Sequence, residues 1–333
     1  MTFAVPFSSC RPNPFSLSFR LLLPLFFAHL LTSTSASLSF NFYGISCPGA
    51  EFVVRNTVRS ASSNDLTVPG KLLRLLFHDC FVDGCDGSVM IEGNSTERSD
   101  PANASLGGFS VIENAKSVLE IFCPGIVSCA DIIALAARDA VEAVGGPVVE
   151  IPTGRKDGTV SVAANVRPNI IDTDFTLDQM LTVFSSKGLS LQDVVILSGA
   201  HTIGSAHCNA FNDRFKRDRK GELELIDKSL DNAYAESLMN KCSSDSASVS
   251  NDPETAFAFD NQYYRNLQAH KGLFQTDSVL LEDQRTRKMV EDLASDQASF
   301  FDKWSESFVK LSLVGVRTGE DGEVRRSCSS VNL

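Results

Sequence analysis

The sequence predicts a mainly α-helical protein whose long loops are held by disulfide bonds. Apolar residues recur at three- and four-residue spacings in seven segments, which is the pattern of helices with one buried face. Segments with the alternating pattern of strands are few and short. The chain also has nine cysteines, and cysteines in an exported protein usually pair.

The expected helices can be justified in chain order from this periodicity and from their capping residues. Ser128 is a plausible cap for the fourth helix, and Gly145 ends it. Ser190 with Asp193 three residues later resembles a capping pair at the start of the sixth helix. The seven expected helices span residues 50–62, 70–81, 109–122, 128–144, 176–187, 190–201 and 300–313.

Residues 1–37 differ from the rest of the chain and predict a signal peptide. They contain no acidic residue, and Arg11 and Arg20 are their only charges before the apolar run 21–31 and a stretch of small residues. A membrane anchor is the alternative, but the run of about 11 residues is far shorter than the roughly 20 that span a bilayer. We therefore expect a mature chain that begins near residue 38 and forms one domain over 38–333.

Charge and composition limit the kinds of partner that the protein is expected to bind. The formal net charge is −11, and removal of the two arginines of the leader makes it −13. Such an excess of acid argues against a nucleic-acid partner, and no membrane span is expected in the mature chain. The only polar, loop-like patch, 243–251, is too short to divide domains, and no internal repeat is apparent.

Eight cysteines remain once Cys10 leaves with the leader, and they predict four disulfides. Eight cysteines allow 105 pairings, among which the sequence alone does not choose. A zinc cluster is the alternative, but no pair has the C-x2-C spacing of such sites. Cys80 and Cys85 are close enough to close a small loop.

Histidine is scarce in the mature chain, so each one can be judged separately. His78 follows Arg74 by four residues on an apolar helix, so both side chains lie on one face. His201 ends a second apolar helix between Gly199 and Gly204, and these glycines would let a bulky, flat group approach the backbone. Spacing alone leaves the alternative of a buried structural histidine open in both cases.

The segments around these two histidines resemble the distal and proximal signatures of class III secretory plant peroxidases. The first, RLLFHDCFVDGCDGS, spans 74–88, and the second, LSGAHTIG, spans 197–204. The resemblance covers nearly all of 38–328 and implies a two-lobed haem peroxidase fold with haem between the distal and proximal helices. Further similar segments are 123–132, 154–157 and 259–264.

The resemblance implies a role for each matching residue. His201 would hold the haem iron, and Asp277 would accept the other ring proton of that histidine. On the opposite face, a neutral His78 would move a proton between the peroxide oxygens. Arg74 would stabilise the negative charge that develops as the oxygen–oxygen bond breaks, and Phe77 would restrict access to the reactive oxygen.

Asn103 matches the family's distal asparagine, which occupies the far ring nitrogen of His78. Asn103 also begins an Asn-Ala-Ser sequon, and the chain is one residue shorter than the usual pattern between it and Phe109. Counting back from Phe109 without a gap selects Ala102 instead. We prefer Asn103 in the buried role, and Asn94 is the better glycosylation candidate because it lies in a polar loop.

The resemblance also implies two calcium ions, which suit closely spaced oxygen atoms near sharply turning glycines. The residues that match the distal site are Asp79, Val82, Gly84, Asp86 and Ser88. Those that match the proximal site are Thr202, Asp252, Thr255, Ala258 and Asp260. The implied disulfides are Cys47–Cys123, Cys80–Cys85, Cys129–Cys328 and Cys208–Cys242.

The predicted function is therefore that of a secreted enzyme that reduces hydrogen peroxide to water with haem b. Its donors would be phenolic or other small aromatic molecules, oxidised by one-electron steps. We expect a monomer that is extracellular or in the plant cell wall, with the vacuole as the alternative. Segment 166–174 departs from the family's Pro-x-Pro element at the edge of the donor site, which leaves the donor preference open.

Two other functions compete with this one. A secreted calcium-binding or wall protein could keep the fold without turnover, but Arg74, His78 and His201 are all intact. A hydrolase could pair a histidine with Ser198 or Ser205, but the chain lacks a Gly-x-Ser-x-Gly motif.

Overall fold

The computed structural model of the chain describes residues 1–4, 37–244 and 246–333. It contains two units, Met1–Ala36 and Ser37–Leu333, and the second holds all the helices and strands given below. The expected signal peptide lies almost entirely outside the described residues, so its boundary stays a prediction.

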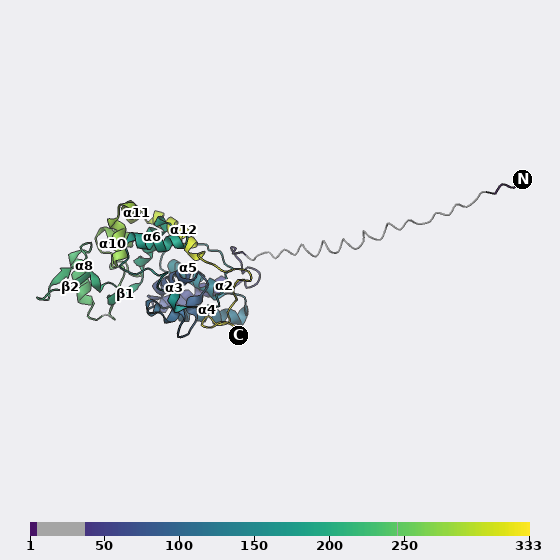
Figure 1. The fold of residues 1–333 in the computed structure, drawn as a ribbon, viewed down its shortest axis with the longest axis horizontal. Coiled ribbons are helices and arrows are strands. Elements are labelled where there is room, and N and C mark those ends of the chain that lie inside the picture. Colours follow the sequence, from purple (N-terminus) through teal and green to yellow (C-terminus); the bar gives the residue numbers. More distant parts are fainter. Residues whose placement is uncertain (5–36, 245) are drawn as a thin grey trace. The chain divides into compact units, whose positions relative to one another are not determined.

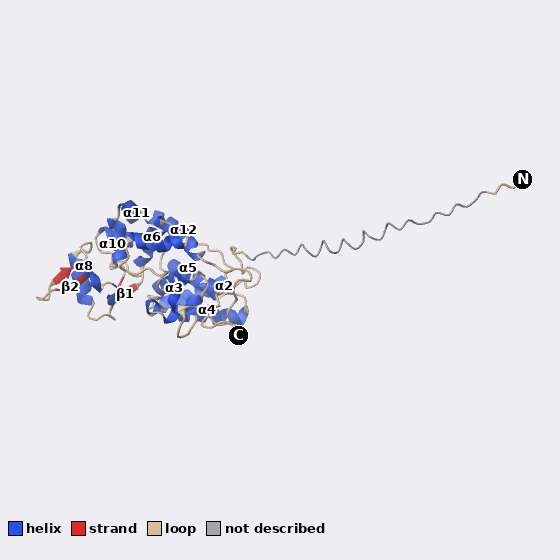
Figure 2. Cartoon of the chain, viewed as in Figure 1, coloured by secondary structure: helices blue, strands red, loops and turns tan. Residues whose placement is uncertain are grey.

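The unit from Ser37 to Leu333 is mainly helical, as the periodicity predicts (Figures 1 and 2). Its α-helices are α2 (Ala50–Asn64), α3 (Val68–Val82), α4 (Phe109–Phe122), α5 (Cys129–Ala143), α6 (Leu177–Ser186), α7 (Leu191–Ser198), α8 (Asn232–Lys241), α9 (Gln262–Gln268), α10 (Gln275–Glu282), α11 (Gln284–Ser295) and α12 (Gln297–Ser312). Short 3₁₀ helices are η1 (Ser88–Met90), η2 (Glu97–Ser99), η3 (Pro101–Asn103), η4 (Ala163–Asn165), η5 (Gly199–Thr202), η6 (Cys208–Ala210) and η7 (Asn212–Arg214).

The seven predicted helices are confirmed as α2 to α7 and α12, each within three residues at either end. The Ser128 side chain accepts a hydrogen bond from the Asp131 amide and so caps α5. Ser190 and Asp193 form a reciprocal capping box at the start of α7. Helices α8 to α11 are absent from the prediction.

Strands are as sparse as expected and form two small antiparallel pairs. The strand β1 (Ser205–His207) pairs with β4 (Ser248–Ser250), and β2 (Phe215–Arg217) pairs with β3 (Leu223–Leu225). With α8 they surround a small apolar cluster that is separate from the main core. The Cys208–Cys242 disulfide lies in this cluster and holds its loops.

The main core is built around α5, whose residues are almost all buried. Five buried alanines on this helix present little side-chain volume, so α2, α3 and α4 can pack closely against it. A second part of the core is aromatic: Phe259 packs edge to face on Trp304 and stacks on Phe300. Both parts belong to one continuous cluster, which fixes the helices that carry the site.

A fully buried ion pair joins distant segments of this core. Arg155 Nη1 lies 2.7 Å from Asp131 Oδ1, and neither side chain is exposed. Asp131 also accepts hydrogen bonds from the Tyr43 hydroxyl and the Gly154 amide, while Arg155 donates to the Ser312 carbonyl at the end of α12. The pair therefore connects the start of the unit, α5 and α12.

All four disulfides have the pairing that the family resemblance implies. The longest, Cys129–Cys328, joins the start of α5 to the C-terminal segment across 199 residues.

In the part of the chain that the structure describes, no single helix has the length and apolar character to cross a membrane. Helices α6 and α7, the latter continued by η5, meet these two criteria only when taken together, and this pair is bent by 106°.

Candidate active site

Helix α3 places Arg74 and His78 on one face, as their spacing predicts. Pro69 lies in the first turn, where its missing amide hydrogen costs nothing. Four leucines on this helix, at positions 72, 73, 75 and 76, are buried and fix its orientation. Arg74 Nε donates a hydrogen bond to His78 Nε2 at 3.2 Å.

The other ring nitrogen of His78 is held by Asn103. His78 Nδ1 lies 2.7 Å from Asn103 Oδ1, and Asn103 Nδ2 donates to the Glu97 carbonyl. That second bond orients the amide so that its oxygen faces the ring, which assigns the proton to Nδ1 and leaves Nε2 as the acceptor. Asn103 is only 2% exposed, whereas Asn94 is exposed.

Burial strongly affects the protonation of His78. Removal from water lowers the pKa of this imidazole, the positive charge of Arg74 lowers it further, and the bond from Asn103 opposes them only in part. The resulting pKa is about 3. His78 is therefore neutral at ordinary pH, and its Nε2 can accept a proton.

Phe77 lies beside this pair and is only partly buried. Its ring packs at 4.1 Å on Phe81 and meets the His78 ring edge to face at 5.8 Å. Because Phe81 is fully buried, the position of Phe77 is set by the core.

The second histidine, His201, lies in η5, directly after α7. Its Nδ1 is 2.8 Å from Asp277 Oδ1. Asp277 is 2% exposed, whereas 36% of the His201 side chain is exposed, so the imidazole reaches outward from a buried carboxylate. Burial alone would raise the pKa of Asp277, but His201 and the hydrogen bonds around the carboxylate lower it overall. Nε2 of His201 is therefore the ring nitrogen that remains available to coordinate a metal.

Asp277 is fixed from three sides. It lies in the first turn of α10, where its Oδ2 accepts a hydrogen bond from the Phe274 amide. Its Oδ1 accepts a second bond from the Tyr263 hydroxyl at 2.9 Å, besides the bond to His201. The ring of Phe274 meets His201 edge to face at 5.1 Å. Tyr263 is absent from the predicted site.

Two glycines bring the segments of the two histidines together. A Cβ atom added to Gly70, at the start of α3, would lie 2.7 Å from the Gly204 Cα, just after η5. Gly204 also has a φ of +92°, which favours glycine. The family motif includes Gly204, but Gly70 has no signal in the sequence beyond its residue type.

The oxygen atoms expected at the distal calcium site include buried atoms without partners. Asp79 Oδ1 and Ser88 Oγ have no hydrogen-bond partner in the described part of the chain. Burial raises the pKa of Asp79 well above its ordinary value, and the nearby Asp86 and Glu97 raise it further. Arg317 donates to Asp86 Oδ2 at 2.9 Å and offsets part of this charge. Such a buried set of oxygens suits a cation.

The oxygen atoms expected at the proximal site also converge. Thr202 Oγ1 lies 3.1 Å from Asp260 Oδ1 and 3.5 Å from both Asp252 Oδ2 and the Ala258 carbonyl oxygen. Thr255 Oγ1 lies 3.2 Å from the same Asp260 oxygen. Since Thr202 directly follows His201, these oxygens lie beside the outward-reaching histidine.

Over 1–4, 37–244 and 246–333, the structure has no cluster of three or more His, Cys, Asp or Glu side chains arranged to hold a metal ion. Both sets of residues predicted for calcium have only two carboxylates. Their other oxygens are hydroxyls and backbone carbonyls, which are ordinary calcium ligands. The donor chemistry therefore fits calcium, and both sites stay predictions.

Segment 166–174 lies against the loop that carries Asn103. Arg167 is 3.6 Å from Asp100 and 3.2 Å from Asp172. Asp100 caps the short helix η3 in which Asn103 lies. The half-exposed Arg167 therefore links this segment to the loop that carries Asn103.

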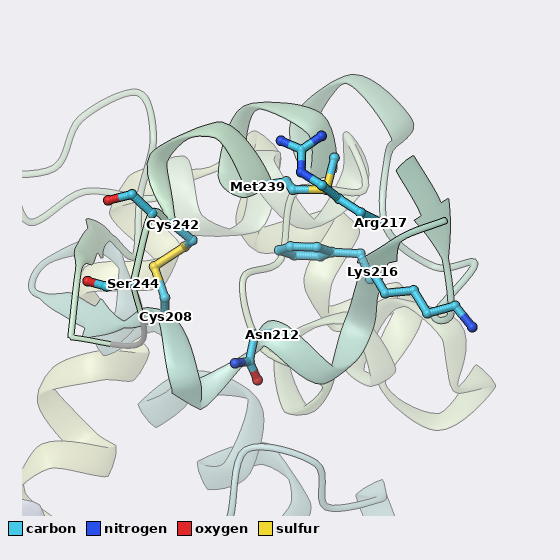
Figure 3. A pocket seen from close by; sticks show the side chains of 9 residues that line it. Cys208, Asn212, Lys216, Arg217, Met239, Cys242 and Ser244 are labelled. Carbon is cyan, nitrogen blue, oxygen red and sulfur yellow. A yellow bond between two sulfur atoms is a disulfide. The ribbon is translucent and has the colours of Figure 1, made fainter. Parts of the chain in front are cut away.

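A hollow of about 300 Å³ lies elsewhere, in the small cluster around β2 and α8. Figure 3 shows the Cys208–Cys242 disulfide on one side of it and Met239 and Arg217 on another. Neither His78 nor His201 lines this hollow. It is not part of the candidate active site.

A mainly helical fold with two such histidines, each tied through Nδ1 to a polar side chain, matches the arrangement expected of a haem peroxidase. The sequence profile of the family described as Peroxidase matches residues 54–296. The chain belongs to this family and, within it, to the class III plant peroxidases.

Relatives cover the chain almost completely. Peroxidase 46 of Arabidopsis thaliana is 75% identical over 313 residues, which are 93% of this chain and 96% of that protein. Peroxidase 18 of the same plant is 71% identical over 333 residues, which are 99% of this chain and 100% of that protein. The chain is thus an enzyme with haem as its cofactor, which reduces hydrogen peroxide and oxidises phenolic or other small aromatic donors.

Proposed function

We propose that His201 Nε2 holds the iron of haem b and that Arg74, His78 and Asn103 act on hydrogen peroxide at the opposite face. The observation that supports this assignment is that both histidines have Nδ1 engaged by a side-chain oxygen, which directs Nε2 of each to the reaction. Bound haem supplies the redox chemistry that cleaves peroxide and draws single electrons from donors.

The side chains of the chain supply the proton transfer and the charge. His78 Nε2 takes the proton from one peroxide oxygen and returns it to the departing oxygen, while Asn103 keeps the other ring proton on Nδ1. Arg74 releases its bond to Nε2 and places its charge where negative charge develops. Asp277 keeps the proton of His201 on the side away from the iron. Phe77 limits the approach of larger donors.

Haem binding tests this assignment directly. We expect wild-type protein to bind haem in a one-to-one ratio and the His201→Ala variant to lose most of that binding, because its coordinating nitrogen is gone. Absorption titration of haem-free protein measures both. His207→Ala is the matched control, since His207 is exposed and bonds only the Ser246 carbonyl in the contacts described. Equal haem affinity in His201→Ala and His207→Ala would refute the assignment.

We also propose that two calcium ions bind at the two sets of residues described above. Wild-type protein is expected to hold two calcium ions, and Asp86→Asn and Asp252→Asn are each expected to hold one. Because the pKa of Asp79 is raised, protons compete with calcium for this carboxylate, and the calcium affinity of the distal site should fall as the pH falls. Elemental analysis after dialysis gives the number of bound ions, and calcium titrations at two pH values give the affinity.

The exposed Asp292, which pairs with Lys288, supplies the control for the calcium experiment. Asp292→Asn is expected to retain both ions. Two ions in Asp86→Asn, or none in wild-type protein, would contradict the proposed distal site.

We further propose that residues 1–37 are a signal peptide and that 38–333 act as a monomer outside the cell or in the cell wall, with a glycan at Asn94. Class III plant peroxidases are generally secreted, and the composition of 1–37 supports the same destination. N-terminal sequencing of the protein recovered from a plant host would show a start near residue 38. An intact Met1 would contradict the proposal.

A further inference from the structure

The hydroxyl of Tyr263 and the imidazole of His201 share one carboxylate oxygen. Tyr263 donates to Asp277 Oδ1 at 2.9 Å, and His201 Nδ1 lies 2.8 Å from the same atom. Tyr263 is 4% exposed, so water has little access to compete for its hydroxyl. One oxygen of the Asp277 carboxylate therefore accepts hydrogen bonds from two donors.

The position of Tyr263 is set by the fold. It lies in the first turn of α9, and Asn261, just before that helix, donates to the carbonyls of Leu293 and Ala294 at the end of α11. The Tyr263 ring lies 6.1 Å from the His201 ring, edge to face. The helix thus holds the hydroxyl toward Asp277, and the ring cannot turn away without moving buried neighbours.

Sharing one oxygen weakens each bond to it. A donor to a carboxylate stabilises its negative charge, and this stabilisation is strong where water is excluded. The oxygen then attracts the second donor less. With the Tyr263 hydroxyl removed, Asp277 would draw the His201 proton more strongly, and the imidazole would become the more electron-rich ligand. An electron-rich ligand stabilises the ferric state of iron relative to the ferrous state.

We propose that Tyr263 is a positioning residue that moderates the His201–Asp277 hydrogen bond and so sets the reduction potential of the bound haem. The inference rests on the proposed function, because it requires His201 to be the iron ligand. It extends that proposal by assigning a role to a third residue behind the ligand. Tyr263 acts through Asp277 and touches no reacting atom.

The adjacent tyrosine provides a matched control. Tyr264 is also fully buried, but its hydroxyl donates to the Val195 and Ile196 carbonyls in α7 rather than to a carboxylate. Tyr263→Phe and Tyr264→Phe therefore each remove one buried hydroxyl from the same helix. Only the first changes the number of donors on Asp277.

The test is the ferric–ferrous midpoint potential of haem-loaded protein, measured by spectroelectrochemical titration. Tyr263→Phe is expected to favour the ferric state about threefold, which is a potential lower by about 30 mV at 59 mV per tenfold change. The iron–histidine stretching band in the resonance Raman spectrum of the ferrous protein should move to higher frequency. Tyr264→Phe should leave both unchanged, and Asp277→Asn should move both in the opposite direction.

A second measurement does not depend on the folding of Tyr263→Phe. The chain has only four tyrosines, so 3-fluorotyrosine can replace those that remain in the Tyr264→Phe protein. Fluorination makes the Tyr263 hydroxyl a stronger donor, so the potential is expected to rise.

The possible outcomes distinguish a failure of the role proposed for Tyr263 from a failure of the assignment of His201 and Asp277. If Asp277→Asn leaves the potential unchanged, the assignment of His201 and Asp277 fails, and the inference fails with it. If Asp277→Asn shifts the potential while Tyr263→Phe does not, only the role of Tyr263 is overturned. Equal shifts in Tyr263→Phe and Tyr264→Phe would also overturn it, because the effect would then be a general one of losing a buried hydroxyl.

Discussion

Replacing His78 with leucine is expected to slow the reaction with hydrogen peroxide by about 10²- to 10⁴-fold, the usual contribution of a positioned acid–base group. The variant loses the Nε2 acceptor but keeps apolar volume on a helix whose other buried side chains include four leucines. It should therefore still bind haem. Stopped-flow absorbance at rising peroxide concentration gives the second-order rate constant, with bound haem measured in the same sample.

The pH dependence of the same rate constant provides an independent check. Protonation of His78 removes its acceptor, so the wild-type rate should fall only as the pH drops toward its pKa of about 3. The rate is expected to be flat between about pH 5 and pH 8, where an ordinary histidine would titrate. The exposed His207 supplies the control His207→Leu. A wild-type rate that halves near pH 6.5, or a His78→Leu rate equal to that of the control, would contradict the assignment.

Replacing Arg155 with methionine is expected to lower the free energy of unfolding by about 3–5 kcal/mol, because it leaves the Asp131 carboxylate buried without its counter-charge. Methionine keeps much of the length of arginine, so the loss of charge and of hydrogen bonds to Ser312 dominates. Guanidinium unfolding of the haem-loaded protein, with all disulfides intact, measures the difference.

The exposed pair Lys288 and Asp292 gives the comparison for that experiment. Lys288→Met should cost less than about 1 kcal/mol, since solvent screens surface ion pairs. Adding Asp131→Asn to Arg155→Met should restore part of the lost stability because no buried charge remains. Equal unfolding midpoints for Arg155→Met and Lys288→Met would mean that the buried pair contributes nothing.

The helices that the sequence predicts are those whose apolar residues recur at three- and four-residue spacings. In α5, every position from Cys129 to Val141 is buried. Helix α11 buries four residues, Thr286, Val290, Leu293 and Ala294, and they lie among charged residues that obscure the pattern. Helix α9 has seven residues, which is about two turns and too few to establish a period. These helices depend on tertiary packing rather than on a local pattern.

Contacts in the candidate site are also of two kinds: those between residues close in the sequence, which spacing predicts, and those between distant residues, which it does not. Arg74 and His78 are four residues apart on one helix, so their shared face follows from spacing. Asn103 and His78 are 25 residues apart, and Asp277 and His201 are 76 apart, so only the family resemblance indicated these partners. Neither helical spacing nor the family resemblance indicated Tyr263. The residues next to it in the sequence do not show that its hydroxyl reaches a carboxylate 14 residues away.

The Cys129–Cys328 disulfide has a consequence for how the protein is made. The two cysteines are 199 residues apart, and ribosomes add about 5–20 residues per second, so Cys129 emerges about 10–40 s before its partner. During that interval, its thiol is free beside the earlier Cys47 and Cys123, and it can pair wrongly with either. The start of the central helix is therefore locked only after translation has almost ended. Premature termination between Cys242 and Cys328 would leave the mature chain with seven cysteines and therefore with one unpaired thiol.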